Sequence, residues 1–156
     1  MATLEVTVPE DSQNIEGVVT IRAPLDRVFG AYVDPDLFTQ WWGRGNPMKV
    51  HHYDCRSGGS WHFTEISDHG EHGFTGSIHE VAPNERIIQT FEYLGLPERG
   101  HVALERADFV AIDPQTTEIR TLSTFQSRED RDGMVSSGME AGWRQSVEAL
   151  GRLIEE

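Results

Sequence analysis

Seven histidines are the first residues whose chemistry needs interpretation, because imidazole titrates near neutral pH and is a common metal ligand. The densest groups are the pair His51-His52 and the segment from His69 to His72. Neither spacing matches a familiar zinc motif, and Cys55, the one cysteine of the chain, cannot supply a pair of thiolates. A solvated hairpin tip explains His69 and His72 more simply, so we expect no metal site.

The other side chains suited to proton transfer lie in segments whose composition predicts strands: His62, His79, Glu80, Glu92 and Asp108. Side chains alternate between the two faces of a strand, which puts His62 opposite to Trp61, so both cannot line one cavity. Outward-facing, solvated side chains are the simpler interpretation for most of these residues. Local spacing yields no Ser/His/Asp or Cys/His set, so we expect no catalytic residues and no cofactor.

Aromatic side chains are the most informative set in the sequence: Trp41, Trp42, Trp61, Phe63, Phe74, Phe91, Tyr93, Phe109, Phe125 and Trp143. Trp61 and Phe63 share one strand face, as do Phe91 and Tyr93. Ordinary core packing explains many such sets. The alternative is an apolar pocket, since ligand pockets are typically lined by hydrophobic and aromatic side chains with few polar groups. The elements that position these residues decide between the two interpretations.

Two short helices are predicted after an initial strand at residues 17–22, whose β-branched side chains end at Ala23-Pro24. From Pro24, apolar residues recur at spacings of three and four up to Val33, which is typical of an amphipathic helix. A second start follows at Asp34-Pro35, where Asp34 can cap the helix and Pro35 can occupy its first position.

Beyond Gly43 the apolar pattern changes to a period of two, which predicts strands at residues 47–55, 59–67, 73–82, 86–94, 101–112 and 117–126. The segments between them are short and contain turn-forming residues. Because no crossover helix separates these strands, we expect an antiparallel sheet.

One long C-terminal helix is predicted from Ser127, since residues 127–130 form a variant of the capping box. Its apolar residues form a single stripe: Val135, Met139, Trp143, Val147, Leu150 and Ile154. Four glycines, Gly133, Gly138, Gly142 and Gly151, interrupt it, although each interior glycine costs about 0.5 to 1 kcal/mol relative to alanine. They indicate close packing on the sheet, a kink near the start of the helix, or room left for a ligand.

We expect a pocket between the sheet and this helix, because a concave sheet under a glycine-bearing helix is difficult to fill completely. Methionines would suit an adaptable wall of such a pocket. The residues predicted to bind the ligand are Trp42, Trp61, Phe63, Phe74, Phe91, Tyr93, Met134, Met139 and Trp143.

Composition limits the partners of the chain. Against 26 Asp and Glu, 13 Lys and Arg give a formal charge of −13, which disfavours nucleic acid and anionic membranes and leaves a basic protein partner open. The 156 residues suit one domain at residues 15–156, preceded by an extension or edge strand at residues 1–14. The single cysteine, and an N-terminus without a basic or apolar run, predict a cytoplasmic protein. We expect a monomer or a homodimer.

Several short segments occur in a meaningful order along residues 17–155: Ala23-Pro24 with Val28-Phe29, Asp34-Pro35 with Trp41-Trp42-Gly43, Gly58-Gly59-Ser60-Trp61, residues 76–83, residues 90–93, and Gly133-Met134 with Gly138-Met139 through Gly142-Trp143. In this order they resemble the activator of heat-shock-protein ATPase homologue family, which is part of the START-like, or SRPBCC, superfamily. The resemblance implies an α+β helix-grip fold. In that fold a curved antiparallel sheet of about six or seven strands wraps around the long C-terminal helix, with two short helices after the first strand.

The resemblance implies three functions. The first, which we favour, is non-catalytic binding of a hydrophobic or amphipathic small molecule between sheet and helix. The second is a polyketide cyclase-like or dehydratase-like enzyme, which requires an inward-facing histidine or carboxylate with a shifted pKa. The third is a protein-interaction module that activates a chaperone ATPase, as in the eukaryotic co-chaperone that gives the family its name. That function requires an exposed patch of interface size.

Overall fold

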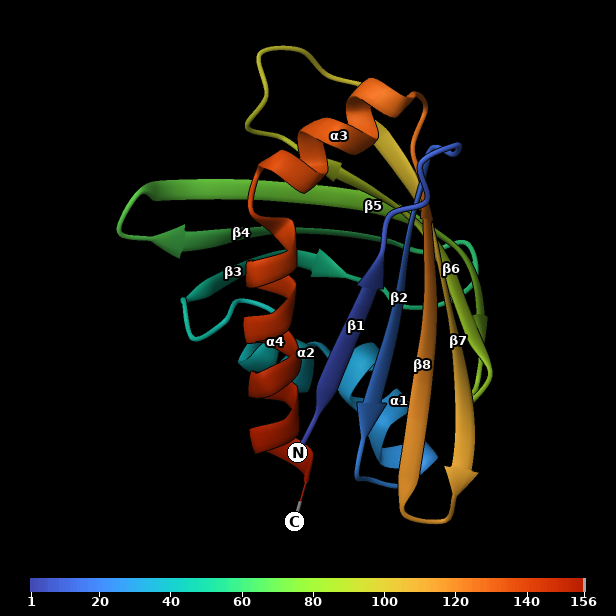
Figure 1. The fold of residues 1–156 in the computed structure, drawn as a ribbon. Helices are drawn as coiled ribbons and strands as arrows, with labels where there is room; N and C mark the ends of the chain where they lie inside the picture. Colours follow the sequence, from blue (N-terminus) through green and yellow to red (C-terminus); the bar gives the residue numbers. More distant parts are fainter. Residues whose placement is uncertain (156) are drawn as a thin grey trace.

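Residues 1–155, which the computed structural model describes, fold into one antiparallel sheet of eight strands and four helices (Figure 1). The strands are β1 (Thr3–Thr7), β2 (Asn14–Ile21), β3 (Met48–Tyr53), β4 (Ser60–Ser67), β5 (Gly70–Ala82), β6 (Arg86–Tyr93), β7 (Val102–Asp113) and β8 (Thr116–Thr124). The helices are α1 (Leu25–Val33), α2 (Pro35–Trp41), α3 (Arg128–Ser136) and α4 (Met139–Ile154). The eighth strand, β1, lies at the edge of the sheet, in the segment for which the sequence left an extension or an edge strand open.

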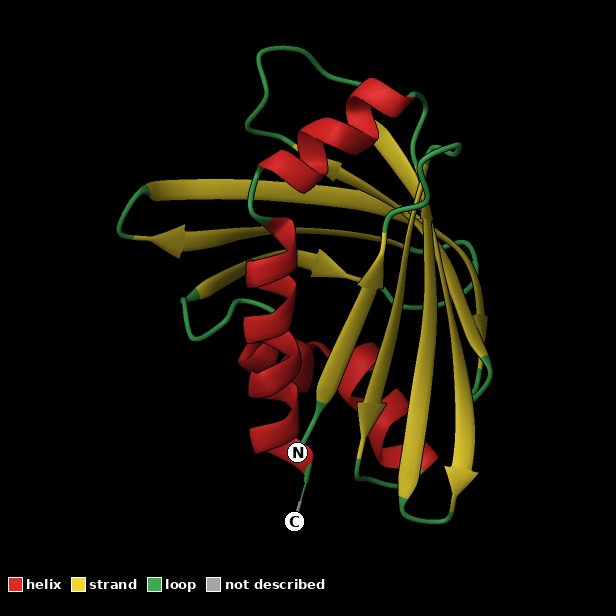
Figure 2. Ribbon diagram, viewed as in Figure 1, coloured by secondary structure: helices red, strands yellow, loops and turns green. Residues whose placement is uncertain are grey.

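The order of the strands is β1-β2-β8-β7-β6-β5-β4-β3, so β3 to β8 form a meander and β2 pairs with β8. Figures 1 and 2 show β3 and β4 crossing behind α4, whereas β1, β2 and β8 run along its side. The sheet therefore curves around the last helix, and the predicted antiparallel helix-grip architecture is confirmed.

Side-chain alternation gives this sheet an inner face, which we define as the face that carries Val19, Phe63 and Ile119 and is covered by α1, α2 and α4. Val19 and Ile119 are paired across β2 and β8 and are both 0% exposed, and Leu150 of α4 is also 0% exposed. The main core thus lies between the inner face and the helices, because burial of apolar surface there stabilises the fold.

The two short helices form where the sequence predicts them. The Val28 amide donates to the Pro24 carbonyl over 3.1 Å in the first turn of α1. Asp34 then caps α2, because its carboxylate accepts from the Asp36 amide over 2.9 Å, and Pro35 occupies the first helical position. None of the helices within residues 1–155 combines the length and the hydropathy that a membrane span needs.

The predicted start of the long C-terminal helix at Ser127 is wrong, because the segment breaks at Ser137-Gly138 into α3 and the 16-residue α4, which is the helix that the sheet encloses. Ser127 does cap the first helix, accepting from the Asp130 amide over 3.0 Å. Gly138 has a φ of 86°, a left-handed conformation that a helix cannot contain and that glycine adopts without steric cost. Val135, predicted to lie on the apolar stripe, is 40% exposed on α3 as a result.

The other glycines of this segment are explained by packing or have open space around them. A Cβ on Gly142 would lie 2.9 Å from Nη1 of Arg44, and one on Gly151 would lie 2.9 Å from Cβ of Ala2. Gly133 has no atom within 4 Å of the corresponding position. Close packing and a helix break therefore account for the glycines better than space for a ligand does.

Replacing Gly138 with alanine is expected to lower the free energy of unfolding by about 1 to 2 kcal/mol, because a Cβ is disfavoured in the left-handed conformation. Gly133→Ala is the matched control: it lies inside α3 with free space around it, so it is expected to stabilise by about 0.5 to 1 kcal/mol. Urea denaturation of both variants checks the pair. Changes of the same sign would contradict the assignment of the break to Gly138.

Candidate functional site

Five of the predicted ligand-binding residues lie together on the inner face, and we call them the aromatic wall: Trp61, Phe63, Phe74, Phe91 and Tyr93. Phe63 pairs with Phe74 across β4 and β5, and Phe74 pairs with Tyr93 across β5 and β6. The ring centroids of Trp61 and Phe63 are 4.8 Å apart, and those of Phe74 and Phe91 are 5.6 Å apart. The rings therefore form one continuous apolar surface over three strands.

Trp42, at the end of α2, packs on this wall with ring centroids 4.9 Å from Phe63 and 5.0 Å from Phe74. Exposure divides the group. Phe63 and Trp61 are each 2% exposed and belong to the closed core, whereas the other four are half-buried: Trp42, Phe74, Phe91 and Tyr93. The half-buried members are those with surface left for another molecule.

The remaining predicted residues, Met134, Met139 and Trp143, come from α3 and α4 and pack in a second apolar group, which we call the upper cluster. Its buried members are Ile15, Ala103 and Phe125. Trp143 also packs against the main core, so it connects the two groups. Its indole lies against β2, where a Cβ on Gly17 would be 2.1 Å from a Trp143 ring carbon. Gly17, which the sequence analysis did not single out, is what allows Trp143 to lie on the sheet.

A group of polar residues that sequence reasoning missed lies between the main core and the upper cluster. We call Gln89, Glu105 and Ser123 the interior polar cluster; they pair in register across β6, β7 and β8 on the inner face. Nε2 of Gln89 donates to one carboxyl oxygen of Glu105 over 3.4 Å, and Oγ of Ser123 donates to the other over 3.5 Å. Both contacts are longer than ordinary hydrogen bonds. The carboxyl group of Glu105 is thus only weakly satisfied by the protein.

The surroundings of Glu105 are apolar on both sides along β7. Ala103, two residues before it, belongs to the upper cluster, and Phe109, four residues after it, belongs to the main core. Burial raises the pKa of Glu105 above its ordinary value of 4.5. Burial, and secondly the charge of Glu105, also raises the pKa of Tyr32 on α1, whose ring lies 5.1 Å from that of Phe109. Yet Glu105 and Tyr32 are both half-buried, so each retains accessible surface.

Strand alternation carried the signal that identifies Glu105. Phe109 and Ala107 face inward on β7, and Glu105 has the same parity, whereas Asp108 has the opposite one. On β6 the inward parity of Phe91 likewise puts Glu92 on the outer face. Two of the three acids considered from the sequence, Glu92 and Asp108, therefore have the parity opposite to that of Glu105.

The other candidates for proton transfer lie mostly on the outer face and are paired with neighbours. His62 stacks on His51 with ring centroids 4.1 Å apart, and burial and then the two neighbouring histidines lower its pKa. Arg86 donates to Glu80 over 2.7 Å, Arg106 donates to Asp108 over 2.8 Å, and His79 is exposed. His69 lies in the β4–β5 turn, and Nδ1 of His72 is 3.2 Å from the Tyr93 hydroxyl. Within residues 1–155, no three His, Cys, Asp or Glu side chains are grouped as a metal site would require.

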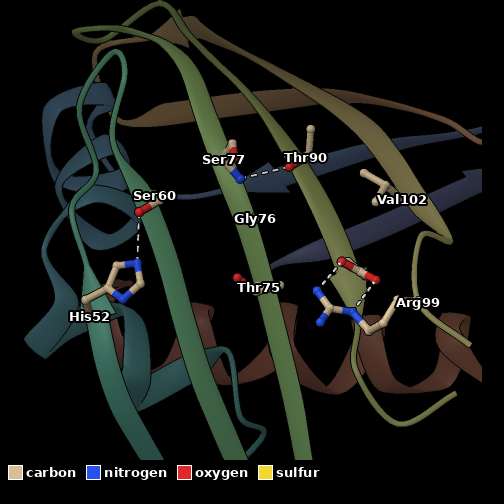
Figure 3. A pocket seen from close by; sticks show the side chains of 9 residues that line it. His52, Ser60, Thr75, Gly76, Ser77, Thr90, Arg99 and Val102 are labelled. Atoms are coloured by element: carbon tan, nitrogen blue, oxygen red, sulfur yellow. Dashed lines mark hydrogen bonds and ion pairs between the residues drawn. The ribbon is translucent and has the colours of Figure 1, made fainter.

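A hollow of about 470 Å³ lies over the outer face, away from the aromatic wall (Figure 3). Its lining is mostly polar: His52, Ser60, Thr75, Gly76, Ser77, Thr90, Glu92, Arg99 and Val102. Arg99 forms a two-point contact with Glu92 over 2.9 and 3.1 Å, and the Gly100 amide donates to the same carboxylate over 2.8 Å. These contacts lower the pKa of Glu92, the Arg99 contact most. The charges of Glu92 and Arg99 in this hollow are thus already paired with each other.

The curved antiparallel sheet, the helix that it encloses and the aromatic inner face define a START-like, helix-grip fold. A family model described as Activator of Hsp90 ATPase homolog 1-like protein matches residues 22–155, and the chain belongs to this family. The family predicted from the sequence is thereby confirmed. No curated protein matches the chain in sequence.

Solved structures share the fold over nearly the whole chain. Protein Ms6760 from Mycobacterium smegmatis has a TM-score of 0.86 at 19% identity, covering 98% of this chain and 97% of its own. Protein CV1439 from Chromobacterium violaceum has a TM-score of 0.79 at 22% identity, covering 92% of this chain and 98% of its own. DynU16, from the dynemicin biosynthetic locus, has a TM-score of 0.68 at 20% identity, covering 90% of this chain and 46% of its own. At these identities the likeness establishes the fold alone.

Proposed function

We propose that the protein binds a hydrophobic or amphipathic small molecule between the inner face of the sheet and α4. The observation that carries this proposal is a contrast in exposure on one face. Val19, Ile119 and Leu150 are 0% exposed, whereas Phe91, Glu105 and Trp143 are half-buried although they face the same interior. Well-packed interiors leave few such side chains, so accessible surface there favours a binding site.

The chemistry of the site supports binding of a molecule with two unlike ends. On β6, Gln89 and Phe91 are successive inward side chains, and their partners on β7 are Glu105 and Ala103. The interior polar cluster therefore borders the aromatic wall directly. A flat apolar body would lie on the wall, and a polar group at its end would reach the cluster.

Ala107 offers a direct test, because it is the inward residue next to Glu105 on β7 and is half-buried. Ala107→Leu would extend into the proposed site. We expect it to weaken binding of prodan, a fluorescent naphthalene ketone, at least about tenfold and to change the melting temperature by less than about 2 °C. Fluorescence titration and thermal denaturation measure the two quantities.

Ala111→Leu is the matched control, since Ala111 lies on the same strand, four residues beyond Ala107, and is exposed near the end of β7. We expect this variant to retain probe binding and to change the free energy of unfolding by less than about 0.5 kcal/mol. The proposal would be contradicted by prodan binding equally to Ala107→Leu and the unmodified protein. It would also be contradicted if fatty acids, flavonoids and aromatic polyketides neither quench tryptophan fluorescence nor raise the melting temperature.

A cyclase-like or dehydratase-like enzyme is a second candidate, and Glu105 is the observation that favours it. An inward carboxyl group with a raised pKa is suited to act as a general acid. DynU16, a fold relative, comes from a biosynthetic locus. Turnover of a polyketide substrate that is lost in Glu105→Gln would support catalysis, and binding without turnover would support the first proposal. Activation of a chaperone ATPase, which the family description suggests, stays a prediction that a direct ATPase assay tests.

A further inference from the structure

The proposed function leaves open what kind of polar group the ligand carries. Resting on that function, we propose that Glu105 binds as a neutral carboxylic acid and donates a hydrogen bond to the carbonyl oxygen of an uncharged aromatic ketone or quinone. The same residue would then discriminate against ligands that present a carboxylate to it. This assigns a specificity-determining role to a residue that the sequence analysis did not select.

The position of Glu105 is the first reason. Its carboxyl group lies between two apolar clusters, and transfer of a carboxylate into such surroundings disfavours the charged form. On the elements around it, β6 presents Gln89, β8 presents Ser123 and α1 presents Tyr32, and none of these carries a positive charge. Burial is accordingly what raises its pKa, with no cation opposing the shift.

The hydrogen bonding of Glu105 is the second reason. Its carboxyl group makes two contacts within residues 1–155, at 3.4 and 3.5 Å, and both are at the long limit for hydrogen bonds. A protonated carboxyl has one strong O–H donor. Neither of the two long contacts uses that O–H donor well. A ligand oxygen at ordinary hydrogen-bond distance could therefore accept from Glu105 without displacing a protein partner.

The neighbours of Glu105 indicate the rest of the ligand. Phe91 pairs with Ala103 two residues along the β6–β7 ladder from Glu105, and the indole of Trp143 lies over Gly17 on the neighbouring part of the inner face. Aromatic rings favour offset or edge contacts with another ring. An aromatic body that carries a carbonyl group at one end therefore matches both parts of the site.

Three probes that differ in one group test this inference: acetylnaphthalene, isopropenylnaphthalene and naphthylethylamine, each substituted at the same ring position. The first two have the same shape, but only the ketone accepts a hydrogen bond, and the third is a cation. Binding is measured by tryptophan quenching between about pH 5 and pH 8, with Glu105→Gln and Glu105→Leu as variants. Glu105→Gln keeps a donor but does not titrate.

We expect the unmodified protein to bind the ketone about tenfold more tightly than the hydrocarbon at low pH, since a buried donor gains a partner. This preference should decline as the pH rises and Glu105 ionises. Glu105→Gln should keep the preference at every pH, and Glu105→Leu should lose it while still binding the hydrocarbon.

Two results would overturn the inference. One is equal binding of ketone and hydrocarbon by the unmodified protein. The other is binding of the amine that strengthens with pH and is lost in Glu105→Gln, which would make Glu105 a counter-ion instead. In both cases the proposed function would still stand if the unmodified protein binds the hydrocarbon and Ala107→Leu does not. Failure of all three probes in every variant would count against the proposed function as well.

Discussion

Arg44→Ala is expected to lower the free energy of unfolding by about 3 kcal/mol, because it leaves a buried carboxylate without its cation. Glu65, on the inner face of β4, is 2% exposed, and Nη2 of Arg44 donates to its two oxygens over 2.7 and 2.8 Å. Asn46 donates to the same carboxylate over 3.1 Å. The figure is at the low end for broken buried pairs, since the Arg44 side chain is itself 33% exposed.

The pair also predicts an asymmetry between its two partners. In Glu65→Leu the guanidinium of Arg44 can turn towards water, so that variant should cost less than Arg44→Ala. The double variant should be more stable than Arg44→Ala alone, because no buried charge is left without a partner. Urea denaturation of the four proteins closes this cycle. Additive changes, or a loss below about 1 kcal/mol in Arg44→Ala, would show that the pair is not energetically buried.

Arg44 illustrates what the sequence could not disclose. The recognised motif Trp41-Trp42-Gly43 ends directly before Arg44. The role of Arg44 depends on β4 and α4, both remote in sequence. Gly142 of α4 has no side chain where Nη1 of Arg44 lies, so the α2–β3 loop contacts the last helix there. A periodicity argument identifies a glycine in a helix but not the distant residue that fills the space.

The fold was readable because its signals are local. Period-two patterns located the strands, and Asp34-Pro35 marked the start of α2. Register was less readable, because β-bulges between Ile78 and Glu80 and between Ala111 and Asp113 shift the parity within β5 and β7. The alternation of side chains between the two faces can be followed only between such irregularities. It therefore places Glu105 on the same face as Phe109, but it does not by itself say which face is inside.

The break between α3 and α4 shows the same limit. Glycines at positions 133 and 138 were compatible with a kink, but α3 is held in place by Arg131, which is 6% exposed and donates to the Pro9 carbonyl over 2.6 Å. That contact joins residues 122 positions apart. Tertiary packing of α3 on the β1–β2 loop therefore accompanies the left-handed turn at Gly138, and local propensity does not encode it.

Glu105→Leu is expected to raise the free energy of unfolding at neutral pH by about 1 to 3 kcal/mol, because it replaces a weakly satisfied, half-buried acid between two apolar clusters with an apolar side chain of similar size. A gain of stability on removal of a residue is typical of functional sites, where binding groups are kept at a cost to the fold. The gain should depend on pH. Below the ordinary pKa of 4.5 the acid is neutral in both the folded and the unfolded state, so no charge is buried.

As the pH rises from 4.5 through the raised pKa of the folded state, the unfolded chain ionises first and the native protein loses stability relative to the variant. The stability gap between Glu105→Leu and the native protein should therefore widen from about pH 4.5 to pH 8 in urea denaturation. Glu92→Gln is the matched control with the opposite sign. Arg99 holds the pKa of Glu92 low, so that variant should be less stable than the native protein at neutral pH and approach it as the pH falls. Two outcomes would contradict this prediction: no difference in stability between Glu105→Leu and the native protein, or a difference that narrows as the pH rises. Either would show that Glu105 is ionised and satisfied in the free protein. The proposed role of Glu105 as a hydrogen-bond donor would then fail.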